Sequence, residues 1–223
     1  MQITLGLNEL AASLQTAGKN DSRKYLNAIC LEVTPTKALL ISANGGMLSA
    51  ILPHSTVTDT PDEMLSAILP HSTITDTPDE MPNDTRQFLI PRELAEQVIK
   101  SFNKNVTIDI AFTLENTVTI SQGTTAFSSK IIDQKFPDWR HLIPSGGQIP
   151  SMGNYVDPQY LVAFAKIAVL LGYKNQEISL NQFSNATEGA LFVDMGIPNL
   201  FGIIMPKRNL PGNTRRDTIP EWL

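Results

Sequence analysis

The stretch RQFLIPRELAEQVIKSF, residues 86–102, contains a short strand followed directly by an amphipathic helix. Residues 87–90 suit a strand, and Pro91 suits a helix start, where its missing N–H has no intrahelical partner. Apolar residues then recur at helical spacing, which predicts a helix with one buried side. These residues are Leu94, Val98 and Phe102.

Three alternating segments follow this helix: VTIDIAFT (106–113), TVTISQG (117–123) and TAFSSKIID (125–133). Alternation of apolar and polar residues is typical of antiparallel strands. The sequence therefore predicts a unit of one strand, one helix and three strands. A helix that is apolar on one side lies across a sheet, so we expect that packing here.

The same plan recurs in NYVDPQYLVAFAKIAVLLGY (154–173), where Asp157 is a good N-cap and Pro158 the first helical residue. Its predicted buried stripe is Leu161, Ala165 and Ala168. The three strands expected after it are QEISLNQF (176–183), GALFVDM (189–195) and FGIIMPKR (201–208).

The N-terminal part is a looser copy of this plan. ITLGL (3–7) predicts a strand, and NELAASLQTAG (8–18) predicts a helix with Leu10 and Leu14 together. NGG (44–46) is a hairpin signal between two of the three strands that follow. These strands are LNAICLEV (26–33), KALLISA (37–43) and MLSAIL (47–52).

A near-perfect tandem repeat interrupts the chain. MLSAILPHSTVTDTPDE (47–63) is followed by MLSAILPHSTITDTPDE (64–80), with Val57 replaced by Ile74. Repeat architectures need at least three copies to bury a shared core, so we interpret the pair as a recent duplication. The alternative is a duplicated metal or catalytic array, but its Thr, Pro and Asp content indicates a loop. That array would comprise His54, His71, Asp59 and Asp76.

Only one copy can pair beside residues 37–43. The NGG turn favours the first copy, and the closure entropy of the loops favours it by about 1 kcal/mol. We therefore predict a strand at 47–52, with much of 53–84 mobile or packed opportunistically.

The composition of the 223 residues suits one large domain or two small ones, with 42% hydrophobic residues. No apolar run approaches the ~20 residues that span a bilayer, and the N-terminus lacks a signal-peptide pattern. The cytoplasm is the expected location. Cys30, the single cysteine, is expected in a buried strand. A net charge of −5 argues against coating nucleic acid with the whole surface, but allows a local basic lining.

Together with FPDWRHLIP (136–144), the repeated plan resembles the bacterial DNA polymerase III β sliding clamp family. Four other stretches resemble that family in order: SRKYLNAICLEV (22–33), LLISANGGMLSAI (39–51), FLIPRELAEQVIKSF (88–102) and FGIIMPKR (201–208). The resemblance implies an α+β DNA-clamp fold, with antiparallel sheets outside and helices on the inner face.

The resemblance also implies a division into domains. We expect a complete clamp-like domain of two units at 1–144, half of another at 145–208, and a tail at 209–223. The family ring contains twelve units, so three units per chain favour self-association, with a ring of four chains. One departure is local: Gly46-Met47 stands where the family hairpin has His-Arg.

Duplex DNA is the first partner that the resemblance implies, contacted through its backbone without sequence reading. The alternative is that the candidate cations are ordinary solvated charges, since Glu9, Glu93 and Glu96 lie among them. The candidates are Arg23, Lys24, Lys100, Lys104 and Lys166.

Short peptides of replicative polymerases or clamp loaders are the second implied partner, held in an apolar pocket with His141 and Lys207 at its rim. The alternative is that the pocket residues only fill core and edge positions. These residues are Gly45, Leu48, Pro137, Leu142, Ile203, Met205 and Pro206.

The resemblance thus predicts a replication processivity factor, and no cofactor, metal or catalytic residue is expected. Two alternatives stay open. One is a clamp-like adaptor or decoy that binds replication proteins without encircling DNA. The other is a hydrolase that uses His54 or His71 with Asp109 or Asp133, although no common catalytic motif is present.

Overall fold

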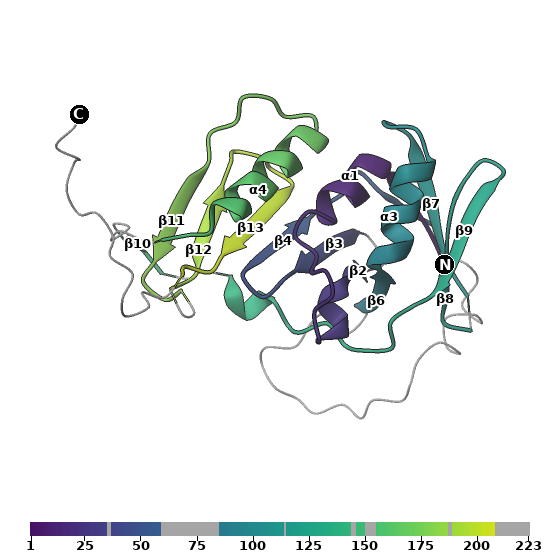
Figure 1. The fold of residues 1–223 in the computed structure, drawn as a ribbon, viewed down its shortest axis with the longest axis horizontal. Coiled ribbons are helices and arrows are strands. Elements are labelled where there is room, and N and C mark those ends of the chain that lie inside the picture. The colour runs from purple at the N-terminus through teal and green to yellow at the C-terminus, as the bar shows by residue number, and fades with distance from the viewer. Residues whose placement is uncertain are drawn as a thin grey trace.

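The computed structural model describes residues 1–34, 37–58, 85–113, 115–143, 146–149, 155–186 and 189–207. In these residues three α-helices lie on one side of two antiparallel sheets (Figure 1). None of these helices is long and apolar enough to span a membrane. The second repeat copy and the predicted tail fall outside the described residues.

Three units follow one another along the chain. The first comprises β1 (Gln2–Gly6), α1 (Leu7–Ser13), the 3₁₀ turn η1 (Lys24–Asn27), β2 (Ala28–Val33), β3 (Ala38–Ala43), β4 (Met47–Ile51) and β5 (Thr56–Thr58). The second comprises β6 (Arg86–Pro91), α3 (Arg92–Ser101), β7 (Thr107–Phe112), β8 (Thr117–Gln122) and β9 (Thr125–Lys130). After the 3₁₀ turn η3 (Arg140–Leu142), the third comprises β10 (Gln148–Ile149), α4 (Pro158–Leu170), β11 (Ser179–Phe183), β12 (Leu191–Asp194) and β13 (Leu200–Ile204).

The first two units exchange their first strands. β1 pairs with β7 of the second unit, and β6 pairs with β2 of the first. Their helices run antiparallel. The start of α3 lies beside the end of α1, where the Arg92 guanidinium donates to the Ala17 carbonyl (2.7 Å). At the opposite ends, Asn8 Nδ2 donates to Asn105 Oδ1 (2.6 Å). The two units therefore form one interlocked pair.

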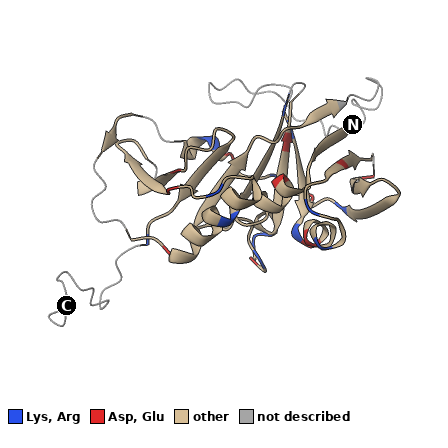
Figure 2. Cartoon of the chain, turned by 90° about the horizontal axis from the view of Figure 1, so that it is seen from above, with Lys and Arg blue, Asp and Glu red and all other residues tan. Residues whose placement is uncertain are grey.

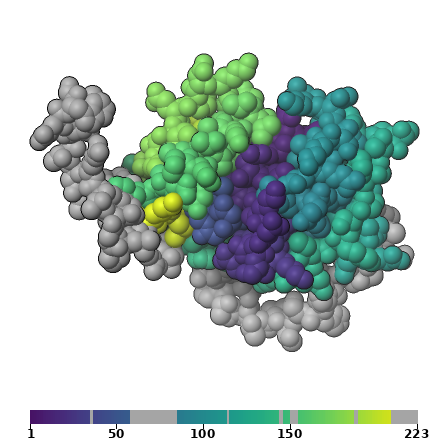
Figure 3. All heavy atoms as spheres, in the orientation of Figure 1, coloured from purple at the N-terminus to yellow at the C-terminus, as the bar shows by residue number. Residues whose placement is uncertain are grey.

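The third unit joins this pair edge to edge. β13 pairs with β4, from Leu200 opposite Ile51 to Ile204 opposite Met47, which makes one eight-stranded sheet. Gly202 in β13 leaves room for the Phe164 ring of α4, since a Cβ there would clash with the ring. Figure 3 shows the third unit packed against the first.

The core runs continuously under all three helices. It includes Leu10 of α1, Val98 of α3 and Phe164 of α4. A second apolar cluster lies on the other face of the large sheet, where residues of the 136–142 segment cover β2, β3 and β4. Every residue of β2 is buried as a result, including Cys30, and burial raises the pKa of its thiol.

Most predicted elements are confirmed. The first repeat copy forms β4, and Asp157 caps α4 by accepting from the Gln159 N–H (3.0 Å). Pro91 ends β6 as the N-cap of α3 rather than being its first residue. Within the segment 53–84, Thr56–Thr58 pair with β1 as β5, and residues 59–84 lie outside the described part of the chain.

The predicted stripe of α4 is also wrong in part. The helix buries Ala163, Phe164, Ile167 and Ala168, whereas Ala165 is exposed. Apolar residues occur on most sides of α4, so spacing alone could not identify its buried side.

Candidate functional site

A pocket of about 310 Å³ forms where three distant segments meet, and it is the part of the structure that best matches a predicted site. The hairpin between β3 and β4 forms one wall, the 136–142 segment another and the end of β13 a third. Six of the seven predicted pocket residues line it: Gly45, Leu48, Pro137, Leu142, Ile203 and Met205.

The hairpin wall is fixed by its turn. Asn44 Oδ1 accepts hydrogen bonds from the backbone N–H groups of Gly46 and Met47, both at 3.0 Å. Gly45 has φ +83°, a left-handed conformation that glycine adopts at little cost. The Met205 N–H then donates to the Gly46 carbonyl (2.8 Å), which joins the end of β13 to the turn.

The 136–142 wall is held by an ion pair between Arg140 and the buried carboxylate of Glu32. Arg140 Nη2 donates to Glu32 Oε1, and Gln87 Nε2 donates to the other carboxylate oxygen (3.2 Å). The hydrogen bond to Glu32 raises the pKa of Arg140. Because the Glu32 side chain is only 1% exposed, loss of Arg140 would leave a buried carboxylate without its counter-charge.

Arg23 lies at this pocket and not on the helical face where we expected a DNA contact. It lines the pocket wall, and its guanidinium lies against the turn at Gly45. It also pairs with Asp21 (Nε–Oδ1 3.0 Å), and this hydrogen bond lowers the pKa of Asp21. A guanidinium thus reaches the hairpin from an earlier segment, although the hairpin itself lacks the family's His-Arg.

Three aromatic residues of the pocket were not predicted. Aromatic rings of Tyr25, Phe136 and Trp139 add to its apolar wall. Trp139 Nε1 is buried with no hydrogen-bond partner among the described residues. The sequence offered a signal for the last two, since both belong to FPDWRHLIP.

Two residues that we predicted at the pocket or its rim do not line it in the structure. Pro206 is half-buried beside Gly189 and does not line the pocket. Lys207 pairs with Asp157 (Nζ–Oδ2 2.8 Å), and this contact, with the Gln159 N–H, lowers the pKa of Asp157. His141 does line the pocket, as expected at its rim.

The other predicted DNA-contact residues are exposed. Lys100 lies in the last turn of α3, Lys104 follows it and Lys166 lies on α4, while Lys24 is in η1. Acidic residues accompany them: Glu93 is exposed on α3, and Glu96 binds Arg92 (2.8 Å). Figure 2 shows both signs of charge on the helical side rather than a continuous basic stripe.

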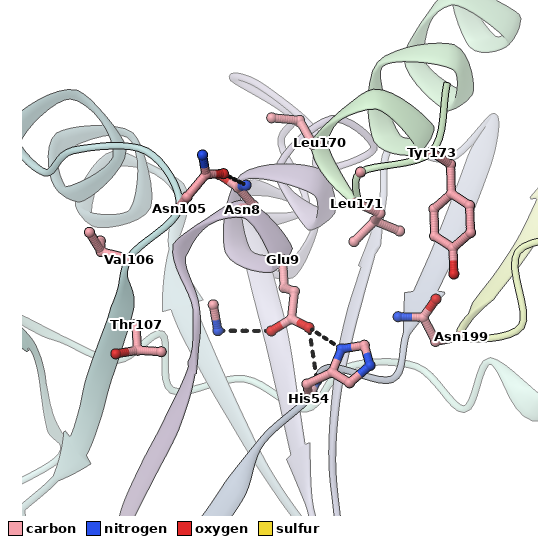
Figure 4. A pocket seen from close by; sticks show the side chains of 12 residues that line it. Asn8, Glu9, His54, Asn105, Val106, Thr107, Leu170, Leu171, Tyr173 and Asn199 are labelled. Atoms are coloured by element: carbon pink, nitrogen blue, oxygen red, sulfur yellow. Dashed lines mark hydrogen bonds and ion pairs between the residues drawn. The ribbon is translucent and has the colours of Figure 1, made fainter. Parts of the chain in front are cut away.

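A second cavity, of about 400 Å³, lies near the start of α1 and the end of α4 (Figure 4). There the buried Glu9 carboxylate accepts hydrogen bonds from the Gly6 N–H (2.8 Å), the His54 N–H (2.8 Å) and the His54 ring (3.1 Å). No pattern in the sequence predicts this role of Glu9. These contacts anchor the chain after β4 to the first turn of α1.

The structure does not bring together the residues of the hydrolase alternative that it describes. His54 contacts Glu9, and Asp109 accepts from Thr4 Oγ1 (2.5 Å). Asp133 is exposed, and His71 lies outside the described residues. In the described part of the chain, no group of three or more His, Cys, Asp and Glu residues could hold a metal ion.

No protein-family model matches the sequence, and no curated protein matches it. The fold, however, matches solved bacterial sliding clamps over 94% of the chain. A Pseudomonas aeruginosa DNA polymerase sliding clamp is 15% identical (TM-score 0.63), and this chain covers 66% of it. A Bacillus subtilis sliding clamp is 13% identical (TM-score 0.64, 65% covered). A Thermotoga maritima DNA polymerase III β subunit is also 13% identical (TM-score 0.61, 66% covered).

These matches confirm the predicted α+β DNA-clamp fold. The chain spans just under two thirds of the length of the Pseudomonas and Bacillus clamps. At 13–15% identity the likeness concerns the fold, so partners have to be argued from the residues of this chain.

Proposed function

We propose that this protein is a sliding-clamp-like processivity factor that binds short peptides of replication proteins and contacts duplex DNA without sequence preference. The observation that carries the proposal is the pocket, because segments around residues 45, 140 and 205 converge on it. On this proposal residues 1–144 act as one clamp-like domain and 145–208 as half of another. The fold of the matched clamps supports this reading.

The chemistry of the pocket suits a peptide with apolar anchors. Leu48, Leu142 and Met205 offer aliphatic walls, and a flexible Met side chain adapts to differently shaped partners. A volume of about 310 Å³ accommodates one or two such anchors. Arg23 and His141 place basic groups beside them, which favours a peptide that also carries a carboxylate.

The DNA contact would come from the helical face. Lys100, Lys104 and Lys166 are exposed there and make no ion pair with a described residue. Phosphate contacts release counterions, so such binding is non-specific and salt-dependent. Closure of a ring around the duplex, with four chains supplying the units, is the fullest form of this proposal.

The second candidate is the adaptor that binds replication proteins without encircling DNA. The mixed charge of the helical face favours it, because Glu93 is exposed and Glu96 neutralises Arg92. The two candidates share the pocket and differ in DNA binding.

Fluorescence anisotropy separates these candidates. A labelled short peptide with Leu and Phe anchors should bind, and labelled duplex DNA should bind with an affinity that falls as salt rises. Lys100→Glu and Lys166→Glu should each flatten the slope of log K against log salt by about one. Lys37→Glu, an exposed charge in the β2–β3 connection, is the matched control.

Peptide binding without salt-sensitive DNA binding would establish the adaptor. Failure of both ligands to bind would refute the proposed function altogether.

A further inference from the structure

The third unit exposes apolar side chains that the first two units do not. Six large hydrophobic residues are exposed in the described chain, and four of them follow residue 148. Two lie on α4: Val162 is 53% exposed and Val169 is 65% exposed. Isolated exposed hydrophobic residues are common, but a cluster on one element marks an interaction surface.

Apolar side chains on one side of α4 form a stripe, here called the α4 flank: Val162, Ala165 and Val169 are exposed, and Leu161 is half-buried beside them. Spacings of three and four residues place them on neighbouring turns of one side of the helix. At about 100° per residue, Ala165 lies roughly opposite Ala163, on the side away from α1. The four flank residues are uncharged, the exposed Lys166 lies at their border beside Val162, and Ala165 at the centre leaves room for another helix.

The interlocked pair shows what covers this side of a unit. There α1 and α3 pack antiparallel, with Arg92 over the end of α1 and Asn8 bonded to Asn105. In contrast, α4 has α1 on one side and no described helix on the other (Figure 1).

The adjoining sheet edge has a shorter pairing in the described residues than the interlocked pair has. β2 pairs with β6 from Ala28 to Val33, and β7 pairs with β1 from Thr107 to Ala111. At the corresponding edge, the described residues of β10 pair with β11 at Phe183 and Gln182. A sheet edge beside an apolar helix is a surface that another chain can cover.

We propose that a second copy of this chain covers the α4 flank, through a two-fold contact that brings two α4 helices together antiparallel and places the two β10–β11 edges beside them. A unit of the same plan fills this position in the interlocked pair, and the third unit is itself such a unit. A two-fold axis perpendicular to α4 generates an antiparallel helix pair, the arrangement of α1 and α3, and two-fold dimers are the commonest homo-oligomers.

This inference deepens the self-association part of the proposed function by naming its surface. It is nevertheless independent of both ligands. The proposed contact and the proposed function can therefore be refuted independently. Mass measurements test the contact, and anisotropy tests ligand binding by the pocket and the helical face.

The first test is the mass of the full chain in solution by light scattering, at tens of micromolar. The double variant Val162→Asp/Val169→Asp should halve the mass, because the contact would bring four carboxylates together in an apolar seam. Both side chains are exposed, so the thermal midpoint and peptide binding of the variant should be retained. Leu52→Asp is the control, since Leu52 is 43% exposed outside the flank and should leave the mass unchanged.

A cross-link tests the geometry directly. Ala165→Cys lies near the proposed axis and should give a covalent dimer on mild oxidation, while Cys30 is fully buried. Gln97→Cys, at an exposed position of α3, should give little covalent dimer under the same oxidation.

Three results would overturn the inference. One is a wild-type chain that remains monomeric at these concentrations, and another is an unchanged mass of the Val162→Asp/Val169→Asp variant. The third is a dimer that forms only after residues 208–223 are deleted, which would assign the flank to the chain's own C-terminal segment.

Discussion

The interlocked pair of units and the third unit follow one plan but stabilise it differently. In the pair, each unit receives a strand from the other, and the exposed side of α3 is polar, with Glu93, Gln97 and Lys100. In the described residues the third unit receives no such strand, and the exposed side of α4 carries Val162, Ala165 and Val169 beside Lys166. It depends instead on the β4–β13 seam and on α1. The same local pattern therefore gives a self-sufficient pair in one place and a dependent unit in another.

The largest expected effect is a loss of stability in the third unit. Phe164 is fully buried on Gly202, so Phe164→Ala should lower the free energy of unfolding by about 3–5 kcal/mol. Because the third unit is the dependent one, hydrogen exchange should increase in β11–β13 before it does in β7–β9. Leu94→Ala, a fully packed position of α3, is the comparison, and exchange that rises equally in both regions would contradict the distinction.

The next largest effect is expected at the ion pair between Glu32 of β2 and Arg140 of the 136–142 segment. Arg140→Met should cost about 3 kcal/mol by urea unfolding, since Glu32 stays buried without its counter-charge. The double variant Arg140→Met/Glu32→Met should recover most of this loss. Equal losses in the single and double variants would show that packing of the 136–142 segment, rather than charge, is responsible.

A third substitution, at Met205, tests whether this side chain belongs to the pocket or to the core. Met205 is half-buried at the pocket, so Met205→Asp should weaken an apolar peptide at least ~10-fold, equivalent to about 1.4 kcal/mol. The thermal midpoint should change little. A large fall in that midpoint would assign Met205 to the core of the β4–β13 seam.

The exposed ion pair between Asp157 and Lys207 should contribute less to the stability of the protein than the pair between Glu32 and Arg140. The depressed pKa of Asp157 means that its contribution is present above its ordinary value of 3.8 and is lost as pH falls through the folded value. Asp157→Asn keeps a capping oxygen without the charge. Thermal midpoints of the two proteins, measured between about pH 2 and pH 7, should differ slightly near neutrality and converge in acid. A constant difference at all pH values would exclude the charge as its source.

The smallest effect is expected from the duplication. Deleting residues 64–80 or residues 47–63 gives two chains that differ only by Val or Ile after the same hairpin. Since β4, the His54–Glu9 contact and β5 all come from one copy, both chains should keep the thermal midpoint and peptide affinity of the full protein. A loss of either in both deletions would indicate a role for the duplicate.

The sequence by itself determined the local elements and their order. Pro158 after Asp157, the NGG turn and period-two strands act through neighbouring residues, so they predict α4, the β3–β4 hairpin and β7–β9 without knowledge of the fold. The family resemblance extended this to the clamp fold and to six residues of the pocket.

Only the tertiary structure decided how the elements combine. The buried side of α4 could not be found from spacing, because a helix that is apolar on most sides gives no preferred direction. Arg23 reached the pocket and Glu9 met His54 through contacts between segments distant in sequence. The pairing of β13 with β4 likewise depends on which strands the fold places side by side. Such pairings are set by the packing of the whole chain, and no local pattern encodes them.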